Sequence, residues 1–417
     1  MASNHCDLPA GLITPEMALD QMLASLMPDI RPEPCALAQA LNRTLSESVQ
    51  AECDVPPAAN SAMDGYAVAW SDLAPQQATP LAISQRIVAG QGPQPLSVGT
   101  CARIFTGAEI PPGADTVIMQ EAVTSLASEQ VLLPSQSEVR QGQNIRAQGQ
   151  DIHSGQTVVS AGTVLAPWHL GVLASVGVAQ VPVVRRLKVA VLCTGDELVL
   201  PGQPLAPGQI YNSNQFMLAG LIERMGHEAW VIDTVEDTLS ATLEALDLAA
   251  AEADLIVTTG GVSVGEEDHV KPAIEQRGEL SVWKVAIKPG KPVAFGHIQS
   301  TAPAGSKSVP VLGLPGNPVS VFVGTQVYLA PILAHCVGQD YHARQGTARL
   351  AGQWQTRARQ EYLRVQGHWA DGDYWLTPCA SQSSGVLSAV AEGNALAILP
   401  PHQQFDEGDR VHYLAYA

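Results

Sequence analysis

The stretch D-L-I-V-T-T-G-G-V-S-V-G-E-E-D at 254–268 decides the fold of this chain. Its apolar run at 255–259 has the length and composition of a buried strand, and a glycine-rich turn follows directly. Similar apolar runs at 187–193 and 229–233 flank a segment at 212–226 that begins with Asn/Ser and stops at glycine, as a helix does. Strands and helices alternating at this spacing predict a doubly wound parallel α/β sheet.

The rest of the chain changes character on both sides of this core. Residues 15–50 are patterned as helices, 146–185 are mixed, and 55–145 are rich in glycine, proline and short alternating runs typical of a small β domain. Short strands follow a hinge near 338–342 and predict a small β barrel or sandwich. We therefore expect a multi-domain α/β plus β protein: an N-terminal α+β domain (12–54 and 146–185), an inserted β domain (55–145), the α/β domain (186–338) and a C-terminal β-barrel-like domain (343–417).

Composition excludes several classes of function. The chain has 417 residues, 46% of them hydrophobic, and its 40 acidic against 22 basic residues give a net charge of −18, which argues against nucleic-acid binding. Its seven cysteines form no C-x-x-C pair, and its histidines show no zinc spacing. The uncharged run 308–339 is interrupted by P-G-N-P and Pro331, so we expect a buried helix and no membrane span. These features predict a soluble, cytoplasmic protein.

The glycine turn permits two interpretations. G-V-S-V-G at 261–265 fits the G-x-S-x-G elbow of hydrolases, in which Ser263 would be a nucleophile. Alternatively, Gly260, Gly261 and Gly265 let backbone N–H groups point inward to cradle an anion, and Ser263 donates a hydrogen bond. The second interpretation also accounts for the carboxylates and lysines that surround the turn.

Carboxylates are expected to gather at the same edge of the sheet. T-G-D-E-L at 194–198 ends the first strand, so Asp196 and Glu197 should lie near Asp268. Carboxylate oxygens suit Mg²⁺, which takes one or two protein ligands and fills its other positions with water and phosphate. These three residues are the predicted metal ligands. The role of Asp237 is ambiguous, because it could instead be the N-cap of the alanine-rich helix that ends near residue 253.

Lysines and prolines follow the carboxylates. Lys284, Lys288 and Lys291 lie in a region with few other charges of a basic-poor chain. The last two flank a Pro-Gly turn, and a compact ammonium suits phosphate or another oxyanion. G-L-P-G-N-P then ends a further strand, and Pro315 and Pro318 would stiffen a loop at the wall of the site. The predicted site thus binds a phosphate-bearing ligand with Mg²⁺.

The combination of motifs resembles one family. The motifs, in order, are N-S-A-M-D-G-Y-A-V (60–68), R-I-F-T-G (103–107), G-Q-D-I (149–152), T-G-D-E-L (194–198), I-Y-N-S-N (210–214), G-G-V-S-V-G-E-E-D (260–268), K-V-A-I-K-P-G-K-P (284–292) and G-L-P-G-N-P (313–318). Together they are similar to the molybdopterin molybdenumtransferases, bacterial relatives of the gephyrin C-terminal domain. The resemblance covers nearly the full length.

The resemblance implies a function and a set of site residues. It implies insertion of molybdate into adenylylated molybdopterin with Mg²⁺ and release of AMP, in an elongated homodimer whose clefts are shared between subunits. A molybdopterin adenylyltransferase would deliver the substrate. The implied catalytic residues are Asp64, Asp151, Glu197, Asp268, Lys284 and Lys288. The implied substrate contacts are Thr106, Asp196, Ser213, Asn214, Asp237, Gly260, Gly261, Ser263, Gly265, Lys291, Pro315, Pro318, Arg364 and Ser384. Lys288, Lys291 and Ser263, with Arg364 and Ser384 of the tail, match a proposed molybdate pocket of the family.

Some positions depart from the family pattern. Ala58 and Ala59 stand where Phe-Asp is frequent, Gln150 replaces a frequent Glu, and His269 replaces a frequent Tyr. Two other functions are alternatives. One is a molybdopterin adenylyltransferase, whose relatives consist essentially of the α/β domain alone. The other is a gephyrin-like binding scaffold, which would not need a complete set of site residues.

Overall fold

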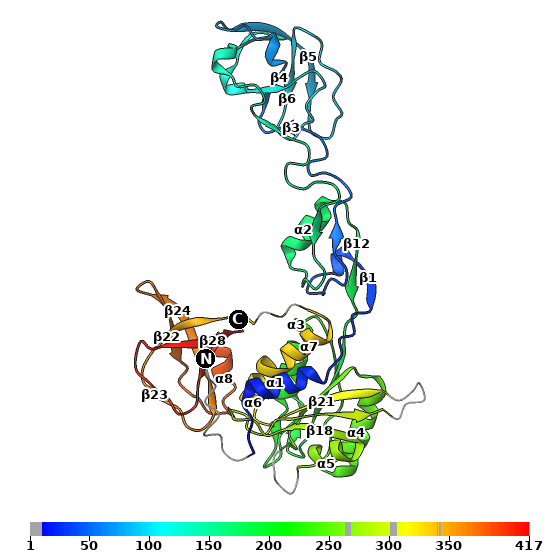
Figure 1. Cartoon of the computed structure of the whole chain (residues 1–417), viewed down its shortest axis with the longest axis vertical. Coiled ribbons are helices and arrows are strands. Elements are labelled where there is room, and N and C mark those ends of the chain that lie inside the picture. Colours follow the sequence, from blue (N-terminus) through cyan, green and yellow to red (C-terminus); the bar gives the residue numbers. More distant parts are fainter. Residues whose placement is uncertain (1–10, 263–267, 301–306, 340, 342, 417) are drawn as a thin grey trace.

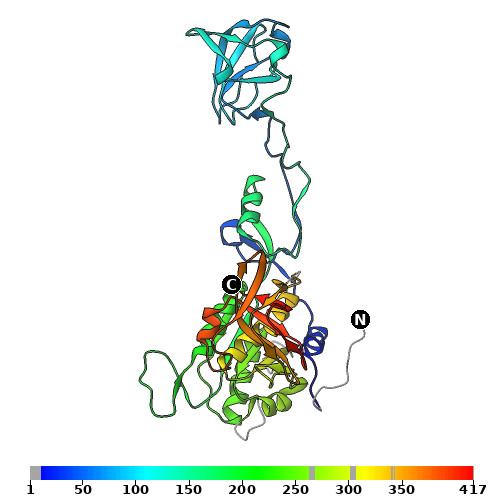
Figure 2. The same cartoon turned by 90° about the vertical axis from the view of Figure 1, so that its left-hand side faces the viewer.

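The chain is elongated and has three levels. The computed structural model describes residues 11–262, 268–300, 307–339, 341 and 343–416. A β lobe lies at one end, a narrow linking region containing α2 (Pro167–Ser175) lies in the middle, and the α/β and C-terminal domains lie side by side at the base (Figure 1). The view at 90° shows the same separation of lobe and base (Figure 2).

The base is built on a six-stranded sheet. Its strands, in spatial order, are β16 (Glu228–Val231), β13 (Lys188–Cys193), β17 (Leu255–Thr259), β21 (Ser308–Leu314), β20 (Ala294–Gln299) and β18 (Gly278–Trp283). The first four run parallel, which confirms the expected α/β sheet, while β20 and β18 add an antiparallel edge. Every residue of β17 is buried, as a strand covered on both faces requires.

Helices cover both faces of this sheet. One face packs against α1 (Pro15–Ala24), α3 (Ser213–Arg224), α6 (Pro318–Gly324) and α7 (Ala330–Cys336), and the other against α4 (Leu239–Glu252) and α5 (Val270–Arg277). With the π-helical turn η5 (Thr325–Leu329), α6 and α7 form one run, Pro318–Cys336, that is apolar enough to cross a membrane, but 72% of its apolar window is buried in the protein. It is a core helix, as expected.

The structure resolves one open question of the sequence analysis and overturns one expectation. Thr238, and not Asp237, caps α4, because the Thr238 hydroxyl accepts a hydrogen bond from the amide of Ala241. The helical pattern expected through residue 50 ends with α1. Prolines at 32 and 34 disfavour a helix there, and β1 (Pro32–Ala36) pairs instead with β12 (Gln180–Val184).

Short paired strands form the linking region. A 3₁₀ turn, η1 (Leu37–Gln39), follows β1, and β2 (Val49–Gln50) pairs with β11 (Thr157–Val159). Because segments before residue 54 pair with segments after 152, the chain leaves and re-enters this region around the lobe.

The distal lobe contains a second six-stranded sheet. Its order is β7 (Thr116–Met119), β4 (Gly65–Val68), β6 (Thr100–Ile104), β5 (Thr79–Ile87), β9 (Gln130–Leu133) and β8 (Thr124–Ala127), with the pair β3 (Asn60–Ser61) and β10 (Ile145–Arg146) at its base. Short 3₁₀ turns connect the strands: η2 (Trp70–Asp72), η3 (Gln120–Ala122) and η4 (Gln136–Glu138).

The C-terminal domain is a closed, barrel-like sheet. Its strands are β24 (Gln360–Ala370), β25 (Asp373–Pro378), β22 (Gln345–Leu350), β28 (Arg410–Ala415) and β26 (Ala395–Leu399), and β24 pairs with both β25 and β26 to close the ring. This domain also contains the strand pair β23 (Trp354–Gln355) with β27 (Gln404–Phe405) and the helix α8 (Ser388–Glu392). The α/β domain contains one further strand pair, β14 (Leu198–Val199) with β15 (Ile210–Tyr211).

One strand joins the two base domains. The segment β19 (Ile287–Lys288) leaves the α/β domain and pairs in parallel with β24, so that Lys288 lies opposite Glu361. The K-P-G-K-P motif is therefore held between the α/β domain and the barrel.

Candidate active site

The glycine turn after β17 is fixed by close backbone packing. Gly260 and Gly261 have φ angles of +90° and +62°, a region that favours glycine. A Cβ atom on Gly260 would lie 2.7 Å from the carbonyl oxygen of Thr194, at the end of the neighbouring strand β13. The turn therefore requires glycine for both conformation and space. The predicted residues Ser263 and Gly265 lie outside the described residues.

One side of the turn opens into a cavity of about 840 Å³, which we call the carboxylate half of the cleft. Its lining includes Glu197, Ser213, Asn214, Asp237, Gly260, Asp268 and Pro318. Beside it, Asp196 Oδ1 accepts a hydrogen bond of 3.1 Å from the amide of Asp237. Burial, followed by the nearby charges of Asp196 and Glu197, raises the pKa of Asp237. These carboxylates are thus crowded and repel one another.

The Asn214 side chain braces the two walls of this half. It is 8% exposed, and its Nδ2 donates a hydrogen bond of 2.7 Å to the carbonyl of Gly316 in the G-L-P-G-N-P turn. Asn212 caps α3 by accepting a hydrogen bond from the amide of Gln215. The start of α3 is therefore tied to the turn after β21.

The other side opens into a cavity of about 600 Å³, which we call the lysine half. Its lining includes Lys288, Lys291, Pro315, Ser320, Arg359, Gln382, Ser383 and Ser384. The Lys288 ammonium donates to Glu361 Oε1 at 3.0 Å, and Trp354 Nε1 donates to Glu361 Oε2 at 3.1 Å. Glu361 is 2% exposed, so a buried carboxylate holds the direction of Lys288.

The two halves meet along a common wall. Gly261, Asp268, Gly316 and Asn317 line both cavities. Asp268 follows the glycine turn and precedes α5, so its carboxylate stands where the halves join. A larger polar ligand in one half and an oxyanion in the other would meet at this residue.

Three predicted residues among the described part of the base lie outside both cavities: Asp196, which is beside the carboxylate half, Lys284 and Arg364. Lys284 has a φ angle of +64° and lines neither half; its ammonium is 5.8 Å from the ring centroid of Trp283. Arg364 is 1% exposed, and its Nε and Nη2 atoms have no hydrogen-bond partner among the residues that the structure describes. Burial lowers the pKa of Arg364. The arginine that faces the lysine half is Arg359, which donates to the carbonyl of Ile287 at 3.2 Å.

The lobe carries its predicted residues far from this cleft. Asp64 Oδ1 accepts hydrogen bonds of 2.8 Å from both the amide and the hydroxyl of Thr106, and these donors, the amide first, lower the pKa of Asp64. Asp151 is exposed, and its amide donates to the carbonyl of Val55 where lobe and linker join. Asp64 directly precedes β4, and Thr106 follows β6; the lobe that contains these two strands lies apart from the base (Figure 1).

Sequence reasoning missed several lining residues. Arg359, Ser320, Asn317, Gln382 and Ser383 were not among the predicted site residues. Asn317 could have been predicted as a lining residue, because it lies between the predicted residues Pro315 and Pro318. Arg359 and Gln382 enter through the docking of the barrel, for which no local pattern exists.

The fold and the cleft define a class of enzyme. A cleft at the carboxyl ends of parallel strands, with lysines and hydroxyls on one side and crowded carboxylates on the other, is suited to transferring an oxyanion to a larger polar ligand. Three family descriptions match consecutive parts of the chain: "MoeA N-terminal region (domain I and II)" at 13–177, "Probable molybdopterin binding domain" at 190–335 and "MoeA C-terminal region (domain IV)" at 347–416.

Similar proteins extend over the whole chain. A molybdopterin molybdenumtransferase of Haemophilus influenzae is 41% identical over 93% of this chain and 94% of its own length, and one of Bacillus subtilis is 30% identical over 88% and 90%. A solved molybdopterin biosynthesis MoeA protein of Pyrococcus horikoshii superposes with a TM-score of 0.81 at 27% identity, over 97% of this chain and all of that one. The chain belongs to the molybdopterin molybdenumtransferase family. It is an enzyme that inserts molybdenum into molybdopterin.

Proposed function

We propose that the cleft holds adenylylated molybdopterin in its carboxylate half and molybdate in its lysine half, and that molybdenum insertion is accompanied by release of AMP. The observation that supports this proposal most directly is the common wall, where Asp268 borders both cavities. A ligand that carries a phosphoanhydride can then present its reacting end to an oxyanion held a short distance away.

The lysine half has the donors that a tetrahedral oxyanion needs. Lys291 makes no side-chain hydrogen bond or ion pair with any described residue, so its ammonium can bind the anion directly. The hydroxyls of Ser320 and Ser383 and the guanidinium of Arg359 border the same space. Lys288 contributes less net charge, because Glu361 neutralises it, and it acts by fixed direction.

The carboxylate half fits Mg²⁺. Burial, followed by the nearby charges of Asp196 and Glu197, raises the pKa of Asp237, and a divalent cation would relieve the repulsion between these charges. The described residues contain no ready group of three or more His, Cys, Asp or Glu ligands, which agrees with an ion that takes one or two carboxylates and keeps its water. One or two of the carboxylates that line the cavity, Glu197, Asp237 and Asp268, would hold it, with Asp196 beside them. Bound Mg²⁺ would screen the charge of the phosphates.

The residues of this chain then act by position and charge. The carboxylate half orients the phosphoanhydride, the lysine half lowers the cost of bringing molybdate to the dithiolene, and no protein nucleophile is required. Water cleaves the phosphoanhydride, and AMP leaves with the oxygen that water supplies.

The test is the dependence of AMP release on molybdate. Purified protein is mixed with adenylylated molybdopterin and Mg²⁺, with and without molybdate, and AMP is measured by chromatography. We expect AMP only with molybdate. Equal release without molybdate would contradict the proposal, and formation of adenylylated molybdopterin from ATP would show an adenylyltransferase instead.

We also infer a homodimer whose clefts each use the lobe of the other subunit. Asp64 and Thr106 form a hydrogen-bonded acidic site that lies outside the described linings of both halves of the cleft, and α2 leaves Trp168 69% and Val172 38% exposed on one helix. An apolar helix face of this kind suits contact with a second copy.

Subunit mixing tests this inference. Asp64→Ala and Asp268→Ala variants should each be inactive alone. Random exchange of their subunits should restore about a quarter of the normal rate, because half of the dimers are hybrids with one intact cleft. No recovery in hybrids, verified by native mass spectrometry, would place the complete site in one chain. We further propose a cytoplasmic location and transient delivery of substrate by a molybdopterin adenylyltransferase.

A further inference from the structure

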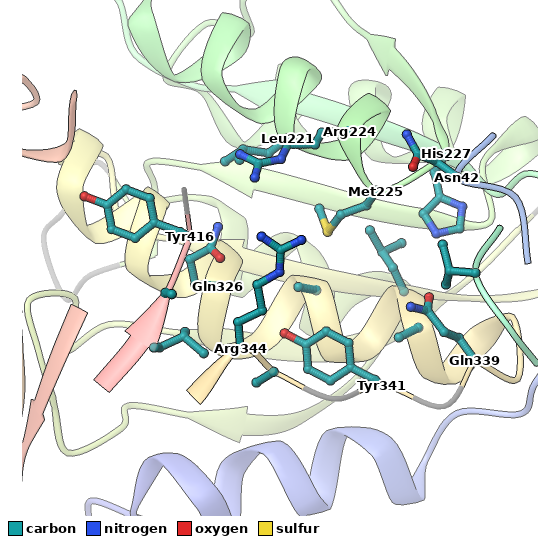
Figure 3. Close-up of a pocket in the computed structure, with 17 residues that line it drawn as sticks. Asn42, Leu221, Arg224, Met225, His227, Gln326, Gln339, Tyr341, Arg344 and Tyr416 are labelled. Atoms are coloured by element: carbon teal, nitrogen blue, oxygen red, sulfur yellow. The ribbon is translucent and has the colours of Figure 1, made fainter. Parts of the chain in front are cut away.

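A separate cavity lies where the α/β domain, the barrel and the linking region meet. Its volume is about 280 Å³, and we call it the junction pocket. It lies between the end of α3, the α7 run and the last residues of β28 (Figure 3). It shares no lining residue with either half of the cleft. It is therefore a distinct space in the fold.

Two arginines give this pocket its charge. Arg224 ends α3, Arg344 precedes β22, and Figure 3 shows the Arg344 side chain reaching into the cavity below Arg224 and Met225. Neither guanidinium forms a hydrogen bond or an ion pair with any described residue, and no Asp or Glu is among the described residues that line the cavity. In a chain of net charge −18, two unpaired guanidiniums on one small cavity favour an anion.

A buried histidine adds a neutral donor. His227 is 6% exposed, and burial, followed by the charges of Arg186 and Arg43, lowers its pKa to about 4. Its Nδ1 accepts a long hydrogen bond of 3.4 Å from the amide of Leu187, so the proton of the neutral ring is on Nε2. That N–H can donate to a ligand in the pocket.

The remaining walls are partly apolar. Leu221, Met225 and Leu333 line the cavity beside Tyr341 and the amide of Gln326. A bare inorganic ion would leave this apolar surface without contacts, whereas a ligand with a small organic group would cover it. Guanidinium groups bind phosphate oxygens through paired N–H donors.

We propose that the junction pocket binds a small organic phosphate, with Arg224 and Arg344 on the phosphate and the apolar wall on the organic group. Such a ligand would join the α/β domain to the barrel. That contact matters for the cleft, because the barrel supplies Arg359 and Glu361 and because α3 begins at the cleft with Asn214. A ligand here can therefore bias the orientation of the barrel on which the lysine half depends.

The experiment measures binding of phenyl phosphate to the full chain by calorimetry without Mg²⁺, with inorganic phosphate and equal ionic strength of chloride as comparisons. The test variant is Arg224→Gln/Arg344→Gln. The matched control is Arg140→Gln/Arg357→Gln, which removes two exposed arginines elsewhere. Lys291→Gln identifies any binding in the cleft. Thermal unfolding verifies that all variants fold.

We expect saturable binding of phenyl phosphate, tighter than that of inorganic phosphate. It should be at least about tenfold weaker in the test variant and unchanged in the control and in Lys291→Gln. Equal affinity of the test variant, loss of binding in Lys291→Gln alone, or no saturable binding at millimolar concentrations would each overturn the proposal. If the test variant fails to fold, Arg344→Lys replaces it, and undiminished affinity there overturns the proposal, because a lysine cannot form the paired contact.

Discussion

The two halves of the cleft are built on opposite electrostatic principles. In the lysine half, Lys288 is already paired with the buried Glu361, and the charge that can bind a ligand comes from Lys291 and Arg359. In the carboxylate half, burial raises the pKa of Asp237, and repulsion from the nearby Asp196 and Glu197 raises it further. In the lysine half only Lys288 is therefore neutralised before ligand binds, whereas the carboxylate half would be stabilised by a cation. Changes that affect each half separately can test this contrast.

Loss of the Asp268 carboxylate, which borders both halves, should have the largest effect on the rate of AMP release. We expect Asp268→Asn to lower AMP release by about 10²–10³-fold, because the variant removes a charge where both ligands meet. The unfolding temperature should stay close to that of the original protein, since a half-buried carboxylate at the edge of the sheet contributes little to the core. Rates are measured with saturating molybdate and Mg²⁺. Retained turnover would mean that the halves do not act together at Asp268.

Breaking the ion pair between Lys288 and Glu361 in the lysine half should have the second largest effect on the kinetics. Glu361→Gln keeps the side-chain size but removes the charge and leaves either Lys288 or Trp354 without an acceptor. Hydrogen bonds to charged groups contribute about 1.5–3 kcal/mol, so the KM for molybdate should rise about 10–100-fold. The KM for adenylylated molybdopterin should change little.

Trp354→Phe is the control for this variant, because it removes the second hydrogen bond to Glu361 and leaves the ion pair intact. An equal rise in both KM values for Glu361→Gln would show that the two halves are not independent.

The glycine turn tests the wall of the carboxylate half. In Gly260→Ala a Cβ atom would meet the Thr194 carbonyl at 2.7 Å, in a backbone conformation that costs a non-glycine residue about 1–2 kcal/mol. The turn must shift, and we expect about tenfold slower AMP release. Gly220→Ala, in open space on α3, should leave the rate unchanged. A Gly260→Ala enzyme with normal kinetics would show that the turn does not position the ligand.

The smallest effect should be the pH dependence of stability at Asp237. Because its pKa is raised in the folded chain, the folded state binds this proton more tightly than the unfolded state. Stability is therefore lost as the pH rises from about 4 through the raised pKa. The Asp237→Asn variant avoids that loss, so it should unfold at a higher temperature than the original protein. The difference between the two unfolding temperatures should grow as the pH rises through this range and stay constant above it.

At neutral pH, Mg²⁺ should reduce the difference in unfolding temperature between Asp237→Asn and the original protein, since the cation offsets the repulsion among the carboxylates. The exposed Asp233→Asn serves as the control in calorimetric scans. If both variants behave alike, the carboxylates of this half do not interact.

Local sequence patterns were sufficient for the elements that make the cleft. The strands at 187–193 and 255–259, the helix at 212–226 and the closed C-terminal sheet follow from patterning. The expected helix beyond residue 35 failed because this segment pairs instead with distant parts of the chain, Leu45 with Val183 and β2 with β11, and such pairing overrides local helix propensity.

The sequence by itself determined the glycine turn, the carboxylates that follow the strands and the Lys288–Lys291 pair, because each depends on residues adjacent in the chain. Only the tertiary structure decided that Glu361, 73 positions away, holds Lys288, that Arg359 faces the cleft while Arg364 is buried, and that Asp64 lies in a remote lobe. These outcomes depend on how β19 pairs with β24 and how the domains dock. Such long-range contacts are selected by the packing of whole surfaces and leave no periodic trace in the local sequence.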